Sequence, residues 1–449
     1  MKQKTTYLKD LKFFVHTFGC QMNDNDSEHI AGILHSYGAN PSDSLEESDL
    51  IVINTCAVRE KSEEKLYSLL GRLNSLRKKK GKNFTIGVVG CVAQLHRSKL
   101  LEKMPHIDFI LGPDNYWQIP EIIPKLLEEK IISTEWSKIW HEIPAAQTLR
   151  TSRVSAFVTI MEGCNNFCAY CIVPYTRGRE KCRPAPQILS EILELAHSGY
   201  KEIQLLGQNV NSYIDPNSKK GFIELLREVN AIEGIDWIRF ITSHPKNFSA
   251  DIAAAMKESE RVCHQLHLPV QSGSTSVLHR MNRGYSRKEY LQIIKNLRRL
   301  MPDICLSTDI IVGFPGESDK EFQETMSLLE EVRYNNIFSF RYSPRPLTEA
   351  EKNKAEVPFA VKKARLMAVQ NLQKNIQIET NQSLVGSTIK VLCTGRSKKN
   401  PDIFSGRNEG YQVINFSSKK EVMDQFVDVH ITSYGPYSLR GHSLQNRQI

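Results

Sequence analysis

Three closely spaced cysteines offer the chemistry around which the rest of this sequence can be arranged. Cys164, Cys168 and Cys171 are separated by three and then two residues, and they follow a strand-like run at residues 154–161. Three thiolates in one loop can hold one face of a compact iron–sulfur cluster. A four-iron cubane bound by three cysteines keeps one iron without a protein ligand, and an open coordination position is typical of catalysis rather than of structural support.

A structural zinc site is the alternative for these cysteines, and it needs a fourth ligand close by. Cys182 follows Cys171 only after the charged run 177–181, and no His lies between them. Ligand number and softness therefore favour a redox cluster. The Cys-x3-Cys-x2-Cys spacing resembles that of the radical S-adenosylmethionine (SAM) enzymes. This resemblance implies that SAM binds the open iron and is cleaved to a 5'-deoxyadenosyl radical.

Length, charge and cysteine use limit the class of protein. The 449 residues are enough for about three domains. The net charge of +9, of which the segment 381–449 carries a disproportionate share, suggests a polyanionic partner. Residues 1–11 lack the apolar core of a secretory signal, and no stretch approaches the about 18 to 20 apolar residues of a membrane helix. Ten cysteines without an export signal predict reduced thiols in a cytoplasmic protein that does not enter a membrane.

The N-terminal third contains three further cysteines in one repeated context. Cys20, Cys56 and Cys91 each end a short apolar run that is typical of a strand, and helical patterns separate these runs. Strand, helix and strand in this order predict a parallel sheet. The carboxyl ends of its strands share one edge, so the three thiols would meet there as a second site. The expected strands are residues 13–20, 50–56 and 84–91, and the expected helices are residues 27–37 and 60–77.

Burial is the alternative role for a cysteine, because a free thiol often behaves as a small hydrophobe. A single cysteine would be interpreted in this way, but three in the same context favour ligands. Cys263, Cys305 and Cys393 lack that context and are assigned to packing, and Cys182 is assigned no role.

The sequence around the first three cysteines resembles the methylthiotransferases, in particular the MiaB-type tRNA enzymes. The resemblance implies an open parallel α/β domain at residues 11–128, in which Cys20, Cys56 and Cys91 hold an auxiliary 4Fe-4S cluster that supplies or carries sulfur. The sister family, RimO, usually has Pro-Lys-Asn after its first cysteine, whereas this chain has the tRNA-type Gln-Met-Asn. Val92 stands where many relatives have Met. The matching stretches are Thr-Phe-Gly-Cys-Gln-Met-Asn at 17–23, Asn-Thr-Cys-Ala-Val-Arg-Glu at 54–60 and Val-Gly-Cys-Val-Ala-Gln at 89–94.

Residues 150–380 alternate β-rich and helical patterns in a way that predicts six βα units. Six such units form a partial barrel, with its site at the carboxyl ends of the strands. The connection 103–150 is expected to contain a helix at 120–130. The expected strands after it are residues 154–161, 202–206, 237–242, 265–270, 304–312 and 336–342. The expected helices are residues 186–197, 221–230, 250–258, 286–300 and 318–333.

Polar loops follow these strands, and each alone has an ordinary explanation as a turn. In order, however, they resemble the MiaB-type radical SAM core along its whole length. The resemblance implies that three loops help to hold SAM, with contacts at Gln208, Gln271, Ser272, Gly273, Gly313 and Gly316. His244 and His267 are interpreted as structural or supporting residues rather than iron ligands. The chain departs from the family at Leu347, where relatives generally have Gly.

The C-terminal segment predicts an amphipathic helix at 359–378 that packs on the barrel, followed by a small β-barrel. Its expected strands are residues 388–392, 411–416 and 426–431, with basic residues in the turns at Arg396, Lys398, Lys399, Arg407 and Lys420. Basic turns suit a phosphate backbone, although a solvated charged face is an equal alternative from charge alone. Ser-Gly-Arg-Asn at 405–408 and its flanking strands resemble a TRAM domain, an RNA-binding module, which implies this domain at residues 383–449.

Taken together, the resemblance implies a tRNA methylthiotransferase that inserts a methylthio group at C2 of N6-(isopentenyl)adenosine next to the anticodon. One SAM would methylate sulfur on the auxiliary cluster, and another would be cleaved at the Cys164, Cys168 and Cys171 cluster to activate the C2–H bond. The implied partners are the tRNA anticodon loop, whose bases are unpaired, and an external electron donor of flavodoxin or ferredoxin type. We expect a monomer. The alternatives are a RimO-type ribosomal protein aspartate methylthiotransferase, a threonylcarbamoyl-adenosine methylthiotransferase, and a non-catalytic zinc and RNA-binding protein.

Overall fold

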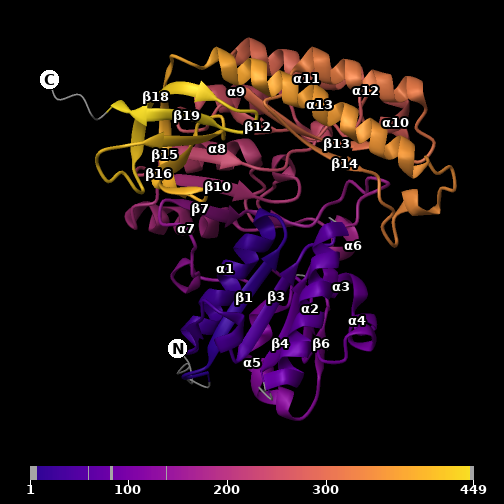
Figure 1. Ribbon diagram of the computed structural model, residues 1–449, viewed down its shortest axis with the longest axis vertical. Coiled ribbons are helices and arrows are strands. Elements are labelled where there is room, and N and C mark those ends of the chain that lie inside the picture. Colours follow the sequence, from indigo (N-terminus) through magenta and orange to yellow (C-terminus); the bar gives the residue numbers. More distant parts are fainter. Residues whose placement is uncertain (1–7, 59, 81–83, 138, 445–449) are drawn as a thin grey trace.

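The computed structural model describes residues 8–58, 60–80, 84–137 and 139–444. Arg59 of the second cysteine motif and residues 445–449 of the expected last domain lie outside these ranges. Three units follow one another along the chain, with the N-terminal unit below a central barrel and a small β-barrel at the upper left (Figure 1). Within the described ranges, no helix combines the length and apolar composition needed to cross a bilayer.

The N-terminal unit is an open sheet covered by helices on both faces. Its elements are β1 (Lys12–Phe18), α1 (Gln21–Ser36), β2 (Asn40–Pro41), β3 (Leu50–Thr55), α2 (Glu60–Lys80), β4 (Thr85–Gly90), α3 (Cys91–His96), α4 (Ser98–Lys103), β5 (Phe109–Leu111), α5 (Ile119–Ile122) and β6 (Ile131–Ser133). The six strands are parallel, in the order β2-β1-β3-β4-β5-β6. All six residues of β3 are buried, as expected for a parallel strand covered on both faces.

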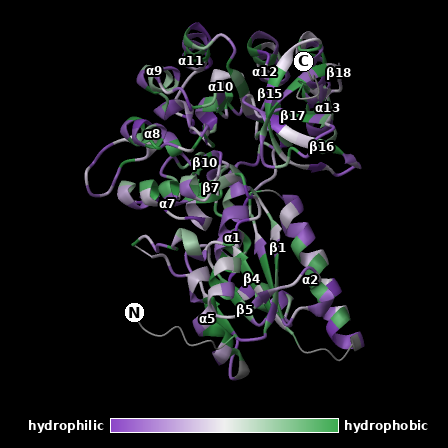
Figure 2. Ribbon diagram, turned by 90° about the vertical axis from the view of Figure 1, so that its left-hand side faces the viewer, coloured by the Kyte–Doolittle hydropathy of each residue, from purple (hydrophilic) through white to green (hydrophobic). Residues whose placement is uncertain are grey.

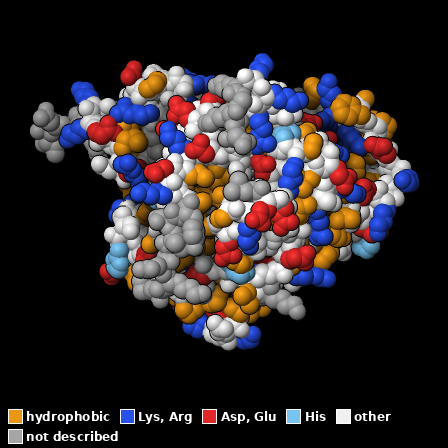
Figure 3. All heavy atoms as spheres, turned by 90° about the horizontal axis from the view of Figure 1, so that it is seen from below, with side chains coloured by type: hydrophobic (Ala, Val, Ile, Leu, Met, Phe, Trp, Pro, Cys, Tyr) orange, Lys and Arg blue, Asp and Glu red, His pale blue; other side chains and the backbone are white. Residues whose placement is uncertain are grey.

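Two apolar clusters line this sheet, one on each face. One joins the strands to α2, α3 and α4, and the other joins them to α1 and α5. Figure 2 shows the hydrophobic strands enclosed between α1 and α2, whose outer faces are hydrophilic. Seen from below, Lys and Arg side chains are interspersed with Asp and Glu over this end of the molecule (Figure 3). The sheet is therefore held by burial on both sides, and its outer surface carries both signs of charge.

The central unit is a partial barrel of six βα units, which confirms the predicted architecture. Its two parallel halves are β7-β10-β11 and β12-β13-β14, and a parallel bridge from Ile238 to Val262 lies between them. The strands are β7 (Ser155–Thr159), β10 (Glu202–Leu206), β11 (Trp237–Phe240), β12 (Gln265–His267), β13 (Cys305–Val312) and β14 (Asn336–Arg341). The helices are α7 (Ala185–His197), α8 (Phe222–Asn230), α9 (Ala250–Glu258), α10 (Thr275–Arg280), α11 (Arg287–Leu300) and α12 (Asp319–Val332). Every second residue of β13 is buried, so one face of the strand packs on the helices and the other faces the barrel interior.

A long helix leads from this barrel into a closed five-stranded β-barrel. The elements are α13 (Phe359–Ser383), β15 (Thr388–Ser397), β16 (Asn400–Asn408), β17 (Val413–Ser417), β18 (Phe426–Tyr434) and β19 (Leu439–Ser443). The strand order around the small barrel is β15-β16-β17-β19-β18. As expected, α13 packs on the central unit, where it contacts α12, β13 and β14.

The small barrel docks on the amino-terminal ends of the central strands. The buried guanidinium of Arg239 on β11 donates to Glu202 at 2.8 Å and to the carbonyl oxygens of Asn408 (2.9 Å) and Glu409. The same guanidinium lies over the ring of Tyr411. The cysteine loops of the central unit follow the opposite, carboxyl ends, so the two features lie at opposite ends of the strands.

The structure differs from the sequence interpretation in several places, and the small barrel has five strands where three were expected. The expected helix at 120–130 is only α5 followed by a 3-10 turn, Ile123–Leu127, because Pro124 cannot donate to an α-helical ladder. The N-terminal sheet has six strands rather than three, since β2, β5 and β6 are too short to show a periodic pattern. Arg396 and Arg407 lie on strands β15 and β16 rather than in turns.

Candidate metal centres

A short hairpin anchors the loop that carries Cys164, Cys168 and Cys171. The loop follows β8 (Met161–Glu162), which pairs with β9 (Lys181–Cys182), and it leads into α6 (Val173–Thr176). The Cys164 amide donates to the carbonyl oxygen of Gly178 at 3.1 Å. Gly163 precedes it at a φ of 77°, where a Cβ would lie 2.1 Å from the Arg179 carbonyl oxygen. Only glycine fits this position, so the backbone fixes where the first cysteine points.

The sequence-predicted cofactor residue Gln208 belongs to this support. Its side-chain oxygen accepts a hydrogen bond of 2.5 Å from the Gly163 amide, so the loop after β10 positions the cysteine loop. Cys164 Sγ in turn accepts from the Asn166 backbone amide at 3.5 Å and from its side-chain amide at 3.4 Å. Hydrogen bonds to sulfur are the usual support of a thiolate that binds a metal cluster.

The electrostatics of the same loop disfavour free thiolates in the absence of a metal. Burial raises the pKa of the Cys164 thiol, and burial together with the neighbouring Cys168 raises the pKa of Cys171 to about 12. Cys168 is buried, whereas the other two are half-buried. A bound metal supplies the positive charge that such thiols need to lose their protons.

The three N-terminal cysteines meet at one edge of the first sheet. Cys20 caps the start of α1 after β1, Cys56 follows β3, and Cys91 begins α3 after β4. Because β1, β3 and β4 are adjacent parallel strands, their carboxyl ends lie side by side. A hydrogen bond from the Cys56 thiol lowers the pKa of Cys20 to about 6, and the Val58 amide donates to Cys56 Sγ at 3.3 Å.

Neither group of sulfur atoms is arranged to surround a single ion. Throughout the described ranges, no set of three or more His, Cys, Asp or Glu side chains has the geometry to hold one metal ion. A cubane cluster binds each cysteine at a different iron, so its thiolates do not converge on one point. The soft, sulfur-only donor sets, with N–H groups directed at the sulfurs, fit clusters of this type.

Arg177 connects the two groups of cysteines. It follows α6, six residues after Cys171, and its buried guanidinium forms an ion pair of 2.5 Å with Asp26 of α1. Burial raises the pKa of the Cys91 thiol, and the positive charge of the same guanidinium opposes this rise and also lowers the pKa of Cys20. Ile172, directly after the last cysteine of the loop, packs into the apolar core formed by α2, α3 and α4. The segment between residues 172 and 177 therefore places the loop that carries Cys164, Cys168 and Cys171 against the edge of the first sheet that carries the N-terminal cysteines.

A second contact between the units comes from the loop after β14. The Ser343 hydroxyl donates to Glu60 at 3.2 Å, and Arg345 donates to the carbonyl oxygen of Val58 at 3.1 Å. Both acceptors lie just after Cys56. Leu347, the position where the family generally has Gly, ends this loop with a φ of 71°, in the left-handed region that disfavours leucine.

The remaining sequence-predicted cofactor residues lie in loops that are braced by helices. The Ser272 hydroxyl lies 3.2 Å from the Thr325 hydroxyl of α12, which also accepts from the Gly273 amide at 2.9 Å. Gln271 is buried at a φ of 75°, and its side-chain oxygen has no hydrogen-bond partner. These contacts fix the loop after β12 and leave a polar amide unsatisfied within it.

Gly313 and Gly316 form a turn with φ values of 71° and 73°. The Gly313 amide donates to the carboxylate of Glu317 at 2.6 Å, and Arg365 of α13 pairs with the same carboxylate at 2.7 Å. The turn after β13 is thus held from outside the barrel by α13. Sequence patterns gave no indication of this contact, because a charged residue on a helix usually faces solvent.

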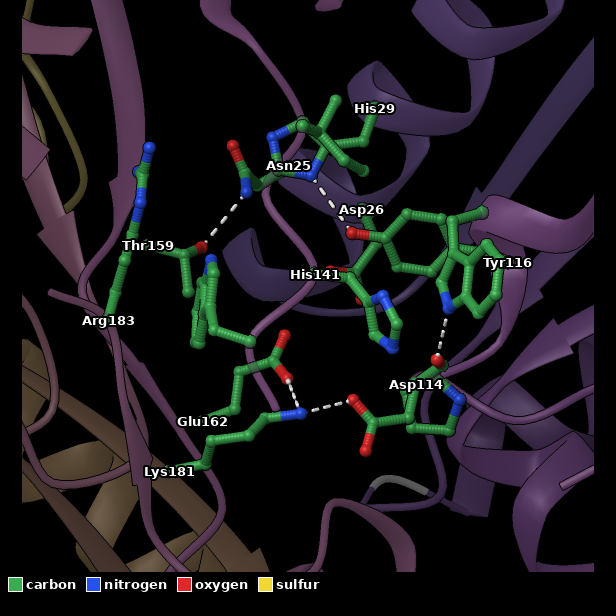
Figure 4. Close-up of a pocket in the computed structure, with 14 residues that line it drawn as sticks. Asn25, Asp26, His29, Asp114, Tyr116, His141, Thr159, Glu162, Lys181 and Arg183 are labelled. Atoms are coloured by element: carbon green, nitrogen blue, oxygen red, sulfur yellow. Dashed lines mark hydrogen bonds and ion pairs between the residues drawn. The ribbon is translucent and has the colours of Figure 1, made fainter. Parts of the chain in front are cut away.

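A narrow polar pocket lies between the N-terminal unit and the barrel. Its volume of about 30 Å³ is room for about one water molecule. Lys181 pairs with Asp114 at 2.5 Å and approaches Glu162 at 3.8 Å, and Asn25 donates to Thr159 at 2.9 Å (Figure 4). The pocket is therefore a small gap within a polar contact between the two units, and it is too small to be a substrate cavity.

Comparison with known proteins defines the class. A family model described as "Uncharacterized protein family UPF0004" matches residues 12–112, the radical SAM superfamily model matches residues 158–329, and the TRAM domain model matches residues 382–444. The chain is therefore a radical SAM protein with a TRAM domain, and this superfamily implies a 4Fe-4S cluster and SAM.

Curated relatives define the family within that class. The chain is 42% identical over 450 residues to the tRNA-2-methylthio-N(6)-dimethylallyladenosine synthase of Clostridium novyi (strain NT), covering 99% of both chains. It is 45% identical over 435 residues to the protein of the same name from Geotalea uraniireducens (strain Rf4), covering 95% of this chain and 98% of the relative. The chain belongs to the family of tRNA-2-methylthio-N(6)-dimethylallyladenosine synthases.

Solved structures with the same fold are more distant in sequence. The radical SAM methyltransferase TsrM from Kitasatospora setae aligns with a TM-score of 0.55 at 11% identity, covering 88% of this chain and 77% of that one. The cobalamin-dependent radical SAM enzyme OxsB aligns with a TM-score of 0.52 at 12% identity, covering 82% and 56%. These likenesses confirm the predicted fold.

Proposed function

We propose that this chain is a tRNA methylthiotransferase that inserts a methylthio group at C2 of N6-(isopentenyl)adenosine next to the anticodon. One observation carries the proposal, namely that each group of three cysteines lies beside an element that the buried Arg177–Asp26 ion pair joins to the other unit. The curated relatives are named for this product.

The six cysteines would hold two clusters. Cys164, Cys168 and Cys171 would hold the radical SAM cluster, and the N-terminal three would hold an auxiliary 4Fe-4S cluster. With an open iron for SAM, the first cluster supplies the radical needed for an unreactive C–H bond. The chain itself fixes the cysteine loop through Gly163 and Gln208.

The polar loops at the carboxyl ends of the strands would bind SAM as methyl donor and radical source. The positions in question are Gln208, Gln271, Ser272, Gly273, Gly313 and Gly316. Support comes from their common place at the active end of a parallel barrel. It also comes from the unsatisfied buried oxygen of Gln271, which is available to a donor from a ligand.

The TRAM domain would contact the phosphates of the tRNA. Exposed basic side chains lie on β15, in the turn before β16 and in the turn after β17, and they are Arg396, Lys398, Lys399, Lys419 and Lys420. Contacts of this kind position a nucleic acid without reading its sequence. A bound anticodon stem-loop would extend from this domain to the cysteine loops at the opposite ends of the strands.

The wider setting follows from the same proposal. The chain would work as a cytoplasmic monomer, with domains at 11–128, 150–380 and 383–449. It would receive electrons from a flavodoxin- or ferredoxin-type donor.

Nucleoside mass spectrometry of tRNA tests the function. Cells that lack this protein would be complemented with the intact chain, with Cys164→Ala, or with Cys182→Ala as a control cysteine outside both groups. We expect 2-methylthio-N6-(isopentenyl)adenosine with the intact chain and the control, and the unmodified N6-(isopentenyl)adenosine with Cys164→Ala.

Other outcomes would identify the alternatives. A methylthio group on threonylcarbamoyl-adenosine, or on a ribosomal protein aspartate with no change in tRNA, would replace the proposed substrate. Zinc in place of iron after anaerobic reconstitution would indicate a non-catalytic zinc and RNA-binding protein.

A further inference from the structure

The middle cysteine of the radical SAM loop has a different environment from its two neighbours. Cys168 is buried, and its sulfur is approached by two nitrogen atoms, one from the loop after β11 and one from the segment after α10. His244 Nε2 lies 3.8 Å from Cys168 Sγ, and Arg283 Nη1 lies 3.4 Å from it. The sulfur of Cys164, in contrast, takes its hydrogen bonds from Asn166 in its own loop.

The contacts of His244 define which ring nitrogen carries the proton. The Lys246 amide donates to His244 Nδ1 at 3.2 Å, so that nitrogen is an acceptor. Because Nδ1 accepts this hydrogen bond, the ring carries a proton on Nε2, the nitrogen that faces the sulfur. Two hydrogen bonds of 2.9 Å with the Asn211 side chain hold the backbone of His244 in place.

Arg283 is a buried cation whose other contacts are all neutral. Its Nη2 donates to the carbonyl oxygen of Pro269 at 2.5 Å, and its Nε donates to the Tyr285 hydroxyl at 2.9 Å. Nη1 is shared between Cys168 and the Tyr170 hydroxyl, each at 3.4 Å. Across the described part of the chain, the hydrogen-bond partners of Arg283 are carbonyl, hydroxyl and sulfur atoms, and it forms no ion pair with a carboxylate.

A buried charge without a counter-charge is costly, so the protein must supply an anion when it is assembled. The group at the end of Nη1 is the Cys168 sulfur, which becomes a thiolate when it binds iron. Arg283 therefore has its counter-charge only when the cysteine loop holds a cluster.

We propose that His244 and Arg283 are positioning residues for the radical SAM cluster, which hydrogen-bond the Cys168 thiolate and set the cluster's reduction potential. This inference rests on the proposed function. Reduction adds a negative charge to the cluster, and a neighbouring cation with directed N–H groups stabilises that state. Removing either donor lowers the potential.

A redox titration monitored by electron paramagnetic resonance tests this assignment. The full-length chain with Cys20, Cys56 and Cys91 all changed to Ala would be reconstituted anaerobically, so that only the radical SAM cluster contributes a signal. Arg283→Gln, Arg283→Lys and His244→Leu would be compared with Arg287→Gln, an arginine on α11 that pairs with Glu331 and makes no contact with a cysteine.

Arg283→Gln is expected to reduce the ratio of reduced to oxidised cluster at least tenfold at a fixed potential, which is about 59 mV for one electron. Arg283→Lys keeps the charge and should recover part of this loss. His244→Leu should shift the potential in the same direction by less, and Arg287→Gln should leave it unchanged.

Unchanged potentials in Arg283→Gln and His244→Leu at full iron content would overturn the inference while leaving the proposed function intact. If Arg283→Gln does not fold, the His244→Leu variant decides the question, because it removes the other nitrogen that contacts the Cys168 sulfur. Failure of the parent chain to bind iron would instead contradict the proposed function.

Discussion

Arg177 and Asp26 form a buried ion pair between two units of the chain, with 2.5 Å between Nη2 and Oδ2 and both side chains almost fully enclosed. Asp26 lies on α1, six residues after Cys20, and Arg177 lies six residues after Cys171. The pair therefore joins the two elements that begin at the two cysteine sites. Since Cys20 caps the helix that carries Asp26, the relative position of the sites depends on this ion pair.

Asp26→Asn should lower the free energy of unfolding by about 3 kcal/mol, because it leaves the buried guanidinium without its main partner. The nearby carboxylate of Glu162, at 3.8 Å from Nη1, limits the loss. Urea denaturation of the apoprotein measures the effect. Asp303→Asn, at an exposed carboxylate, is the control and should change stability by less than about 0.5 kcal/mol. An equal loss of stability in Asp26→Asn and Asp303→Asn would show that the ion pair does not stabilise the contact between the units.

Leu347→Gly should stabilise the protein by up to about 1 kcal/mol, since leucine at a φ of 71° is strained and glycine is not. The exposed Leu193 in the middle of α7 provides the matched control, because Leu193→Gly should destabilise a helix by about the same amount. Thermal unfolding compares the two. A lower melting temperature for Leu347→Gly would mean that the leucine side chain makes a contact worth more than the strain.

His29, which lies at the polar contact between the N-terminal unit and the barrel, should make the folding stability decrease at acidic pH. Burial, together with the charges of Arg150 and Arg183, lowers its pKa to about 3, and its Nδ1 lies 3.0 Å from the Tyr116 hydroxyl. The unfolded chain takes up a proton below about pH 6.5 and the folded chain does not, so stability is lost as the pH falls between these values.

His29→Gln therefore tests this contribution directly. Between pH 7 and pH 5 the wild type should lose about 2 kcal/mol more than His29→Gln, measured by urea denaturation at each pH. His35→Gln, near the end of the same helix, should follow the wild type. Parallel losses in the wild type and His29→Gln would refute the assignment.

Gly410→Val should loosen the docking of the TRAM domain. A Cβ at this position would lie 2.4 Å from Cys305 Sγ and 3.1 Å from its Cβ, so the turn after β16 would have to shift. The expected cost is about 1–3 kcal/mol, with faster hydrogen exchange at residues 408–412. Gly395→Val in the same domain is the control, since a Cβ there meets no atom within 4 Å. Unchanged exchange in Gly410→Val would contradict the docking geometry.

The sequence predicted the long, periodic elements of this fold and the six cysteines, because strands that end in cysteine and the Cys-x3-Cys-x2-Cys spacing are local patterns. It did not indicate the short strands β5 and β6, whose three residues each carry no period. It also missed the charged residues that support the site. An arginine in a sequence is usually expected on the solvated surface. Only contacts with residues more than a hundred positions away show that Arg177 pairs with Asp26 and that Arg283 donates to the sulfur of Cys168.

The central claim is that six cysteines form two separate cluster sites, and iron and acid-labile sulfide analysis after anaerobic reconstitution tests it most directly. The intact chain should bind about eight irons, the content of two four-iron cubanes. Changing Cys20, Cys56 and Cys91 to Ala should leave about four, and changing Cys164, Cys168 and Cys171 to Ala should also leave about four. Binding of zinc instead of iron, or loss of all iron from either triple variant, would contradict the account.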